Sequence, residues 1–288
     1  MRQKMLQPDR DIVYQQVKQA LAEDIGTGDI TAQLLPQEQV IKAEIITREA
    51  MVLCGKAWVE AVFAMLHPAI QLEWLAEEGQ WLESPQTLAC LQGPARELLS
   101  GERVALNFLQ TFSATATQTK RYVSLLKGTG CSLLDTRKTL PGLRYAQKYA
   151  VVCGGGHNHR MGLFDAFLIK ENHIAACGSI VAAVEKARDQ QLSVLIEVEV
   201  ESLEELAEVL PLKPDRIMLD NFTLEQLKQA VSMNSEYACQ LEASGGINLD
   251  NLREVALTGV DFISVGAVTK SINAIDLSMR VREVIKCL

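Results

Sequence analysis

The chain has 288 residues, enough for one large domain or two of moderate size. Its composition, 48% hydrophobic and 22% charged, is ordinary for a globular protein and excludes disordered, collagen-like and coiled-coil chains. The formal net charge of −8 argues against a wholly basic nucleic-acid-binding protein, and no apolar run approaches the roughly 18 residues of a membrane span.

The first 11 residues are polar and lack the apolar stretch of a signal peptide. The seven cysteines are widely spaced, include no C-x-x-C pair, and in several cases lie inside apolar runs. This pattern favours buried, reduced thiols over a disulfide framework. We therefore expect a cytoplasmic protein with no membrane or nucleic-acid partner.

The first hundred residues indicate a small α+β domain. Residues 11–22 carry apolar side chains at helical spacing, whereas residues 40–47 alternate roughly between apolar and polar, as a half-buried strand does. Shorter runs predict a helix at 56–66 and strands at 51–54, 70–75 and 87–91. Several strands with few helices are typical of an α+β layer.

From residue 96 the pattern changes. Residues 96–126 predict one long or broken helix, and short apolar strands then alternate with helices. The predicted strands are 132–135, 166–169, 194–200, 216–219, 239–243 and 262–265. The predicted helices are 143–151, 179–190, 203–210, 224–233 and 249–257. Such alternation is typical of a parallel sheet with helical crossovers.

Each predicted strand of this second region ends in residues suited to chemistry. They are Asp135 to Lys138, Lys170, Glu197 with Glu199, Asp220 with Asn221, Ser244 to Gly246, and Gly266. A (β/α) barrel gathers all its carboxyl strand ends at one mouth, whereas an open doubly wound sheet concentrates them at one switch point. The six strand ends therefore favour a barrel.

Residues 136–170 contain six basic side chains and a single acid, Asp165, within a chain of negative net charge. A solvated basic surface is the usual explanation of such a cluster. Here, however, Lys170 directly follows an apolar strand, and Arg137 and Lys138 follow another. Cations at strand ends point into a barrel mouth, so the pattern favours an anion-binding site.

Two glycine turns, at 244–246 and 265–267, each follow a predicted strand and precede a helix. Glycine lets backbone N–H groups approach a phosphate, and barrels commonly bind phosphate at their last strands. A single such turn usually has no ligand, but two on neighbouring strands favour phosphate binding. Thr269, Lys270 and Ser271 are further candidate donors.

Carboxylates follow two neighbouring strands. Glu199 and Asp220 suit sugar hydroxyls, or Mg²⁺ that phosphates already carry. Glu197 shares a strand face with Glu199 because strands have a period of two, so both are predicted to point inward. Glu201 is better explained as a helix-capping or solvated residue.

The segment GGGHNHR at 154–160 contains a His-x-His pattern that recurs in metal sites. No second ligand pair has the required spacing, and Arg160 would repel a cation. We interpret the segment as a loop passing close to a ligand, with His159 and Arg160 as hydrogen-bond donors. The chain has no G-x-S-x-G nucleophile elbow, and Lys170 leaves a Schiff-base aldolase open as an alternative.

The sequence resembles the quinolinate phosphoribosyltransferase family in segments spread over nearly the whole chain. They are LAEDIGTGDIT at 21–31, DTRKTLPGLR at 135–144, GGGHNHRMGL at 154–163, LIKENH at 168–173, IMLDN at 217–221 and LEASGGI at 241–247. The resemblance implies that quinolinate and phosphoribosyl pyrophosphate react to give nicotinate mononucleotide, pyrophosphate and CO₂ in NAD biosynthesis. It also implies Mg²⁺ as cofactor.

The resemblance further implies a fold, namely an incomplete (β/α) barrel preceded by an N-terminal α+β open-faced sandwich. The expected domains are 1–114 for the sandwich and 115–273 for the barrel, with a final helix at 274–288 packing back on the sandwich. A homodimer is implied as well, in which the sandwich of one subunit covers the barrel mouth of the other.

The site residues that the resemblance implies fall into two sets. Quinolinate would contact Thr136, Arg137, Lys138, His159, Arg160, Lys170 and the partner subunit's Arg103. Phosphoribosyl pyrophosphate would contact Glu199, Asp220, Ser244, Gly245, Gly246, Val265, Gly266 and Ala267. The implied catalytic residues are Lys138, Lys170, Glu199 and Asp220. Mg²⁺ would travel with the pyrophosphate, near Glu199 and Asp220, without a dedicated protein site.

Three alternatives stay open. A molybdenum-transport-associated homologue would share the architecture but have a different anion pocket, and the intact basic residues at 137–138 and 157–160 argue against it. A Schiff-base aldolase would place Lys170 at its centre. A non-catalytic phosphate-binding protein would bind phosphoribosyl pyrophosphate without releasing pyrophosphate.

Overall fold

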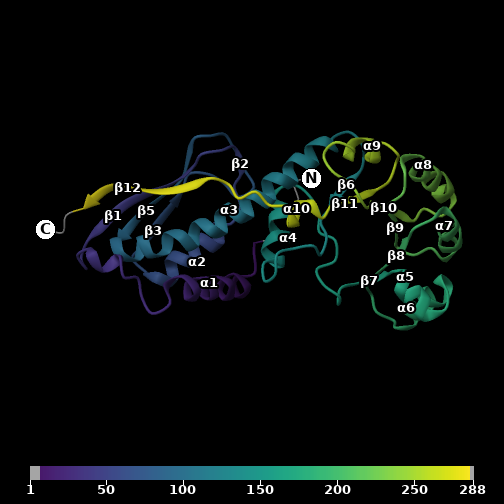
Figure 1. Ribbon diagram of the computed structural model, residues 1–288, viewed down its shortest axis with the longest axis horizontal. Helices are drawn as coiled ribbons and strands as arrows, with labels where there is room; N and C mark the ends of the chain where they lie inside the picture. The colour runs from purple at the N-terminus through teal and green to yellow at the C-terminus, as the bar shows by residue number, and fades with distance from the viewer. Residues whose placement is uncertain (1–6, 286–288) are drawn as a thin grey trace. The chain divides into compact units, whose positions relative to one another are not determined.

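The structure, a computed structural model, describes residues 7–285 and divides into two compact units (Figure 1). The first unit comprises Met1–Lys120, Pro141–Gly155 and Ile272–Leu288, and the second comprises Arg121–Leu140 and Gly156–Ser271. The first division, after Lys120, lies close to the predicted boundary at residue 114, but α4 (Arg144–Cys153), expected in the barrel domain, belongs to the first unit. A Cβ on Gly154 would lie only 2.5 Å from the Ala116 carbonyl, so glycine allows the end of α4 its close contact with this unit.

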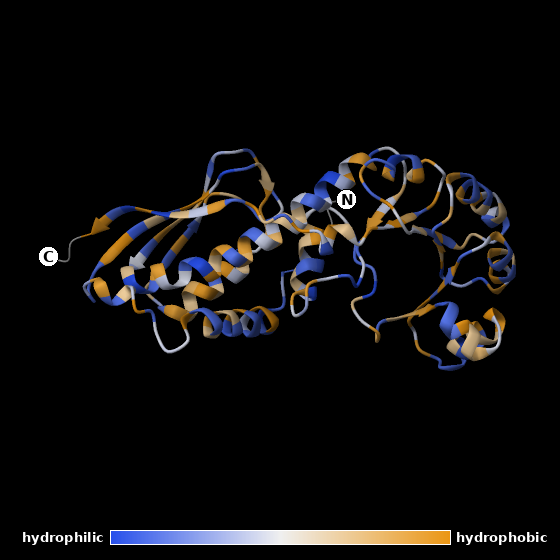
Figure 2. Cartoon of the chain, in the orientation of Figure 1, coloured by the Kyte–Doolittle hydropathy of each residue, from blue (hydrophilic) through white to orange (hydrophobic). Residues whose placement is uncertain are grey.

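The first unit is built on a four-stranded antiparallel sheet in the order β12-β1-β5-β3. Its strands are β1 (Val40–Thr47), β3 (Gln71–Trp74), β5 (Gln86–Pro94) and β12 (Leu277–Ile285). Its helices are α1 (Arg10–Ile25), η1 (Ala32–Leu34), α2 (Lys56–Leu66), α4 and most of α3 (Ala95–Leu125). In addition, β2 (Met51–Val52) pairs with β4 (Trp81–Leu82). Apolar and polar residues alternate along these strands (Figure 2), which gives the sheet one buried face and one open face.

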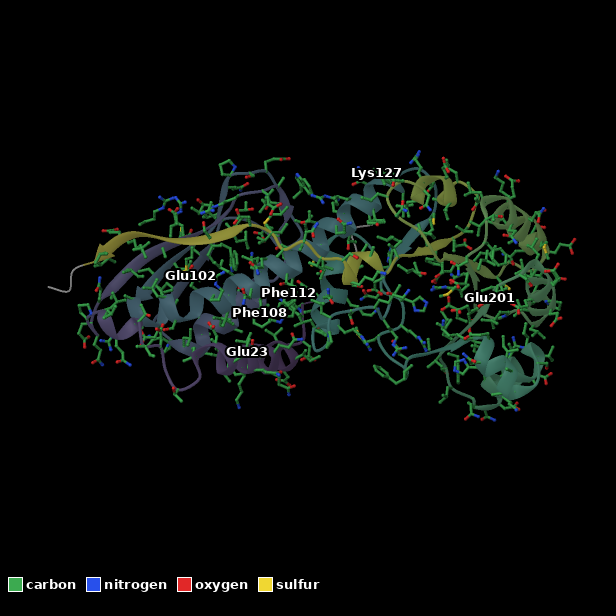
Figure 3. All side chains as sticks on the ribbon, viewed as in Figure 1. Glu23, Glu102, Phe108, Phe112, Lys127 and Glu201 are labelled. Carbon is green, nitrogen blue, oxygen red and sulfur yellow. The ribbon has the colours of Figure 1, made fainter. Side chains whose placement is uncertain are left out.

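Aromatic side chains fill the core between this sheet and its helices. Trp58, Phe63 and Phe112 are almost completely buried. The rings of Trp58 and Phe112 meet edge to face at a centroid distance of 4.8 Å, and the Trp58 Nε1–H donates to Gln16 Oε1 at 2.8 Å. Phe108 and Phe112 lie one turn apart on α3 (Figure 3), with ring centroids 5.6 Å apart. The hydrogen bond from Trp58 to Gln16 gives the buried indole N–H the partner that it requires.

The predicted C-terminal helix at 274–288 is wrong for the described residues. The segment Leu277–Ile285 is strand β12, which pairs antiparallel with β1 from Leu277 opposite Thr47 to Ile285 opposite Val40. Its buried residues Leu277 and Met279 repeat with a period of two, which suits a half-buried strand. Residues 286–288 lie outside the described part of the chain. The C-terminal segment does return to the first unit, but as an added strand.

The second unit is a curved parallel sheet in the order β6-β11-β10-β9-β8-β7, with helices outside it (Figure 1). The strands are β6 (Ser132–Leu134), β7 (Ala166–Ile169), β8 (Leu195–Val200), β9 (Arg216–Asp220), β10 (Gln240–Ser244) and β11 (Phe262–Ser264). The helices are α5 (Glu171–Cys177), α6 (Ile180–Asp189), α7 (Leu203–Val209), η2 (Leu210–Leu212), α8 (Leu224–Met233), η3 (Asn234–Glu236), α9 (Leu252–Ala256) and α10 (Ala267–Lys270).

Strands β6 and β7 are the two edges of this sheet, so the barrel is incomplete between them. An open-faced sandwich followed by an incomplete α/β barrel confirms the predicted fold class. Most predicted strands and helices of this unit also match, although α5 was not predicted.

Six of the seven cysteines lie in the described residues, and all six are free thiols. Cys287 lies outside them. Among the described helices, none combines the length and the apolar character needed to cross a bilayer.

Candidate active site

The polar residues that follow the barrel strands lie at one edge of the sheet, because all six strands run in the same direction. The register sets Asp220 directly opposite Ser244. Every predicted site residue except Arg103 belongs to this second unit. They are Thr136, Arg137, Lys138, His159, Arg160, Lys170, Glu199, Asp220, Ser244, Gly245, Gly246, Val265, Gly266 and Ala267.

The segment after β6 is fixed against the segment after β11. Lys138 donates its backbone N–H to Thr136 Oγ1 at 3.1 Å, and the Thr269 hydroxyl donates to the Lys138 carbonyl at 2.7 Å. A Cβ on Gly266 would lie 2.9 Å from Lys138 Cδ, so glycine leaves room for the lysine side chain. Thr269 thus holds the backbone of Lys138, and its hydroxyl is engaged there, although the sequence indicated a phosphate donor.

The loop that carries His159 and Arg160 lies along the open edge of β6. The backbone N–H of His157 donates to the Leu133 carbonyl at 2.9 Å, and the backbone N–H of Asp135 donates to the His157 carbonyl at 3.1 Å. The backbone N–H of His159 then donates to Asp135 Oδ1 at 2.9 Å. Because Asp135 is buried, its carboxylate fixes the loop beside the end of β6, next to Arg137.

Arg160 and Arg137 are neighbours in this arrangement. Burial lowers the pKa of the Arg160 guanidinium, and the like charge of Arg137 lowers it further. The carboxylates of Glu197, Asp165 and Glu199 act in the opposite direction. Two adjacent guanidinium groups suit a ligand with two carboxylates. The other two basic residues of the predicted cluster, Arg144 and Lys148, lie on α4 in the first unit and follow no barrel strand.

Lys170 and Glu199 form an ion pair across β7 and β8. Lys170 Nζ lies 2.5 Å from Glu199 Oε2, with Lys170 partly exposed and Glu199 buried. The His173 ring accepts the Lys170 backbone N–H at 3.0 Å and so fixes the end of β7. The Lys170 amine is engaged by the Glu199 carboxylate, whereas a Schiff-base lysine must attack a substrate carbonyl. The geometry therefore argues against the aldolase.

The turn after β10 contains two successive glycines with positive φ. Gly245 and Gly246 have φ of +92° and +61°, and a Cβ on Gly245 would lie 2.1 Å from Asn221 Oδ1. The Asn221 N–H donates to the Ser244 carbonyl at 2.9 Å, and its Nδ2 donates to Asp220 Oδ2 at 2.8 Å. Successive glycines with positive φ form the kind of backbone concavity in which N–H groups bind anions. Asn221 also orients the Asp220 carboxylate.

Two charged residues beside the predicted site, Arg216 and Glu242, were not predicted from the sequence. They surround His159 together with Glu197 inside the barrel. His159 Nε2 lies 2.9 Å from Glu197 Oε2 and 3.6 Å from Glu242 Oε2, and Arg216 Nη1 lies 3.1 Å from Glu242 Oε2. Burial raises the pKa of Glu197 and of Glu242 to about 7 in each case. A signal existed, because Glu242 lies two residues before Ser244 and therefore on the same strand face.

Arg103 is the predicted site residue that lies in the first unit, on α3, with an exposed side chain. Burial raises the pKa of the neighbouring Glu102, and the charge of Arg103 opposes that rise. The barrel unit by itself therefore contains the other predicted site residues but not Arg103. Its contribution to a partner's site stays a prediction.

Several groups of side chains could hold a metal ion, since their ligand atoms lie within 4.8 Å of one another. Among the described residues these groups are Cys54 with Glu78 and Cys153, His159 with Glu197 and Glu242, and Glu171 with Glu199 and Glu201. The last group lies at the strand ends and offers only carboxylate oxygens, which suit Mg²⁺. In the first group, Glu78 already accepts the backbone N–H groups of Gly55 and Lys56.

Comparison with known proteins gives consistent matches. Family models described as the N-terminal and C-terminal domains of quinolinate phosphoribosyl transferase match residues 29–113 and 115–280. The chain is 43% identical over 260 residues to the probable nicotinate-nucleotide pyrophosphorylase (carboxylating) of Bacillus subtilis (strain 168), with 90% of each chain covered. It is 41% identical over 278 residues to that of Mycobacterium leprae (strain TN), covering 93% of this chain and 97% of the relative.

Solved structures agree with these matches. The nicotinate-nucleotide pyrophosphorylase from Francisella tularensis superposes with a TM-score of 0.93 at 48% identity, over 96% of this chain and 98% of that one. NadC from Streptococcus pyogenes superposes with a TM-score of 0.94 at 35% identity, over 98% of this chain and the whole of the other. With both domains matched in order, the chain belongs to the quinolinate phosphoribosyltransferase family.

Proposed function

We propose that this chain transfers the phosphoribosyl group of phosphoribosyl pyrophosphate to quinolinate, releasing pyrophosphate and CO₂ and forming nicotinate mononucleotide for NAD biosynthesis. One observation carries the proposal. In a member of this family, the basic residues Arg137, Arg160 and Lys170 and the carboxylates of Glu199 and Asp220 all lie at or after the carboxyl ends of strands in one parallel sheet, and Lys170 pairs with Glu199. The cations suit a dianionic acceptor, and the carboxylates suit a sugar that becomes positively charged.

Quinolinate carries two carboxylates and therefore needs several cationic donors. Arg137, Lys138, Arg160 and Lys170 would supply them, and His159, whose ring accepts the Arg160 backbone N–H at 2.7 Å, belongs to the same half of the site. The ion pair of Lys170 with Glu199 holds the lysine at the boundary between the acceptor and the sugar. This set also argues against the molybdenum-transport-associated homologue, whose anion pocket would differ.

Phosphoribosyl pyrophosphate would bind on the opposite side of that boundary. Its 5′-phosphate would take backbone donors from two turns, with Ser244, Gly245 and Gly246 after β10 and Val265, Gly266 and Ala267 after β11. Glu199 and Asp220 would hold the ribose hydroxyls. As the bond from C1′ to pyrophosphate breaks, positive charge develops at C1′, and these two carboxylates stabilise it.

The acceptor chemistry needs no protein nucleophile. The pyridine nitrogen of quinolinate forms a bond to C1′ and becomes a ring cation. The bond from the ring to the 2-carboxylate then breaks, because the ring cation stabilises the electron pair that CO₂ leaves behind. That carbon finally takes a proton. Lys138 and Lys170 would offset the charge of the pyrophosphate and the acceptor while these bonds change.

Mg²⁺ is the proposed cofactor. The carboxylates of Glu199, Asp220, Glu171 and Glu201 are hard oxygen ligands at the strand ends, so the donor set fits this ion. Pyrophosphate oxygens would hold it, with Glu199 and Asp220 beside it. When bound, Mg²⁺ supplies positive charge that stabilises the leaving pyrophosphate.

A homodimer with shared active sites is proposed as well, in which the partner subunit's Arg103 completes each quinolinate pocket. Three features of the first unit support it. Arg103 is exposed on α3, and the apolar side chains of Ile30 and Leu34 are each 82% exposed. Bonds from Ser100 Oγ to Asp29 Oδ2 at 2.7 Å and from Arg96 to the Leu35 carbonyl fix that apolar segment to α3. A fixed, exposed apolar segment on the helix of Arg103 is suited to a subunit interface.

The free thiols of the described cysteines support a cytoplasmic location, since the cytoplasm keeps thiols reduced.

Activity is tested by incubating the chain with quinolinate, phosphoribosyl pyrophosphate and Mg²⁺ and measuring pyrophosphate. We expect release that requires all three. Binding of phosphoribosyl pyrophosphate without pyrophosphate release would favour the non-catalytic alternative, and borohydride trapping of Lys170 with a carbonyl substrate would favour the aldolase.

A further inference from the structure

The interior of the barrel holds charged residues below the strand ends. Glu197 on β8 and Glu242 on β10 are completely buried, and Arg216 lies on β9 between them with its side chain 11% exposed. The interiors of such barrels are normally filled with branched apolar side chains. Buried charges lower stability unless they are well paired, and apolar replacements of similar volume are often at least as stable. Their presence here calls for an explanation other than stability.

The buried residues converge on the ring of His159. Its Nε2 lies 2.9 Å from Glu197 and 3.6 Å from Glu242, and Arg216 contacts Glu242 at 3.1 Å. Both carboxyl groups also face the guanidinium of Arg216, and Glu197 interacts with that of Arg160 as well. The imidazole is therefore held by electrostatic contacts from two different strands.

The other nitrogen of the same ring fixes Arg160. His159 Nδ1 accepts the backbone N–H of Arg160 at 2.7 Å, which places the ring proton on Nε2, facing the two carboxylates. The backbone N–H of His159 donates to the buried Asp135 at 2.9 Å. The backbone that carries Arg160 is thus attached to the barrel through the ring of His159 and through Asp135.

The Arg160 guanidinium needs such support. Its one backbone contact given by the structure, Nη1 to the Ala166 carbonyl, is long at 3.4 Å, and the like charge of Arg137 is close. Two neighbouring guanidiniums repel one another until a dianion binds between them. The positions of these two guanidinium groups must therefore be fixed by other residues of the barrel.

We propose that Glu197 and Glu242 are positioning residues, which hold the His159 ring and through it present Arg160 to the two carboxylates of the acceptor. The inference rests on the proposed function of this site, and it concerns only the acceptor half. The sugar half is fixed differently, since Glu199 and Asp220 belong to strands and the glycine turns follow them directly. Loss of either buried carboxylate should therefore weaken quinolinate binding and spare the sugar substrate.

The test uses the full chain with Glu197→Gln and Glu242→Gln, two substitutions that keep the side-chain volume and remove the charge. We expect KM for quinolinate to rise about tenfold or more, the loss typical of residues that orient a binding side chain, with KM for phosphoribosyl pyrophosphate changed less than about twofold. Glu78→Gln is the matched control. It removes a half-buried carboxylate that accepts backbone N–H groups at the start of α2, and it should lower the melting temperature without changing either KM.

A double-mutant cycle with His159→Ala tests whether the effect runs through the ring. If it does, Glu197→Gln adds almost nothing to the quinolinate KM of the His159→Ala enzyme. Additive effects, equal losses for both substrates, or folding failure of both Gln variants would overturn the inference and assign a purely structural role. Wild-type chain that fails to turn over quinolinate would instead refute the proposed function, and this inference with it.

Discussion

The sheets of the two units place their charged side chains differently. In the sandwich unit, ion pairs cross between strands on the open face of the sheet, as in Lys42 with Glu283 at 2.7 Å and Arg282 with Glu44 at 2.8 Å, and the core is aromatic and aliphatic. In the barrel unit, Glu197 and Glu242 are completely buried. Exposed pairs contribute about 0–1 kcal/mol each, whereas buried charges cost stability unless fully compensated. The exposed ion pairs of the sandwich sheet therefore change its stability little, whereas the buried carboxylates of the barrel reduce stability at the candidate site.

This contrast predicts that substitutions at the barrel strand ends remove activity and leave stability nearly unchanged. Lys170→Ala should abolish quinolinate turnover, lowering kcat/KM by about 10³-fold or more, because it removes a cation that both substrates need. Thermal unfolding should change little, since Lys170 is partly exposed and not part of the core. Lys228→Ala, which breaks an exposed pair with Glu225 on α8, is the matched control and should retain full activity. Near-normal turnover by Lys170→Ala would refute the assignment.

The cation group also predicts strong selectivity for the dianion. Nicotinate lacks the 2-carboxylate and would leave part of the group around Arg137 and Arg160 unpaired. We expect its kcat/KM to be lower than that of quinolinate by about 10²–10³-fold, because sites built around a polar group reject analogues without it. Steady-state kinetics with both acids measure the ratio. Comparable values would show that these cations do not form a dianion pocket.

The sandwich is expected to contribute one side chain to the chemistry, and complementation tests this. Arg103→Ala and Lys170→Ala subunits, each inactive alone, are refolded together in equal amounts. In a mixed dimer one site combines an intact Lys170 with the partner subunit's intact Arg103. Random pairing makes about half of the dimers mixed, with one good site each, so about a quarter of wild-type activity should return. No recovery would mean that Arg103 acts within its own subunit, and an Arg103→Ala enzyme that is active alone would mean that Arg103 has no role in the site.

The smallest expected effect is on the pH dependence of stability. The pKa of Glu242 is raised from 4.5 to about 7, so the folded state holds its proton more tightly than the unfolded chain does. Stability from this group is therefore present at low pH and is lost as pH rises through about 4.5 to 7. Glu242→Gln resembles the protonated form, so its melting temperature should gain on that of the wild type between pH 5 and pH 8.

The exposed Glu283 of the sandwich provides the comparison for this titration. Glu283→Gln should leave the melting temperature close to that of the wild type, since this side chain is 56% exposed and an exposed pair contributes about 0–1 kcal/mol. Equal pH dependence for both variants would contradict the contrast between buried and exposed charge.

Much of this architecture could be predicted because it follows local patterns. The alternation of short apolar strands with helices after residue 126 predicts the parallel sheet, and the polar residues at strand ends predict which side chains lie at one edge of it. The helix at 274–288 was expected from the resemblance alone, and the strand Leu277–Ile285 that lies there instead exists only through pairing with β1, more than 200 residues earlier in the chain. Local pattern does not encode such a partner.

The same reason explains what was missed around His159. Arg216 and Glu242 are charged residues inside predicted strands, and nothing local says which neighbour they meet. Their role depends on the loop at 157–160 lying along β6, which the carboxylate of Asp135 fixes. The assignment of α4 to the first unit likewise depends on a non-local contact, the approach of Gly154 to Ala116.

The most direct measurement follows a labelled 2-carboxylate of quinolinate through the reaction. With phosphoribosyl pyrophosphate and Mg²⁺ present, we expect labelled CO₂ and pyrophosphate to appear in equal amounts, and no CO₂ when the sugar substrate is omitted. This result would mean that ring-nitrogen attack at C1′ enables decarboxylation at the strand-end site. Release of CO₂ without the sugar substrate, or pyrophosphate formation with the label retained, would contradict the account.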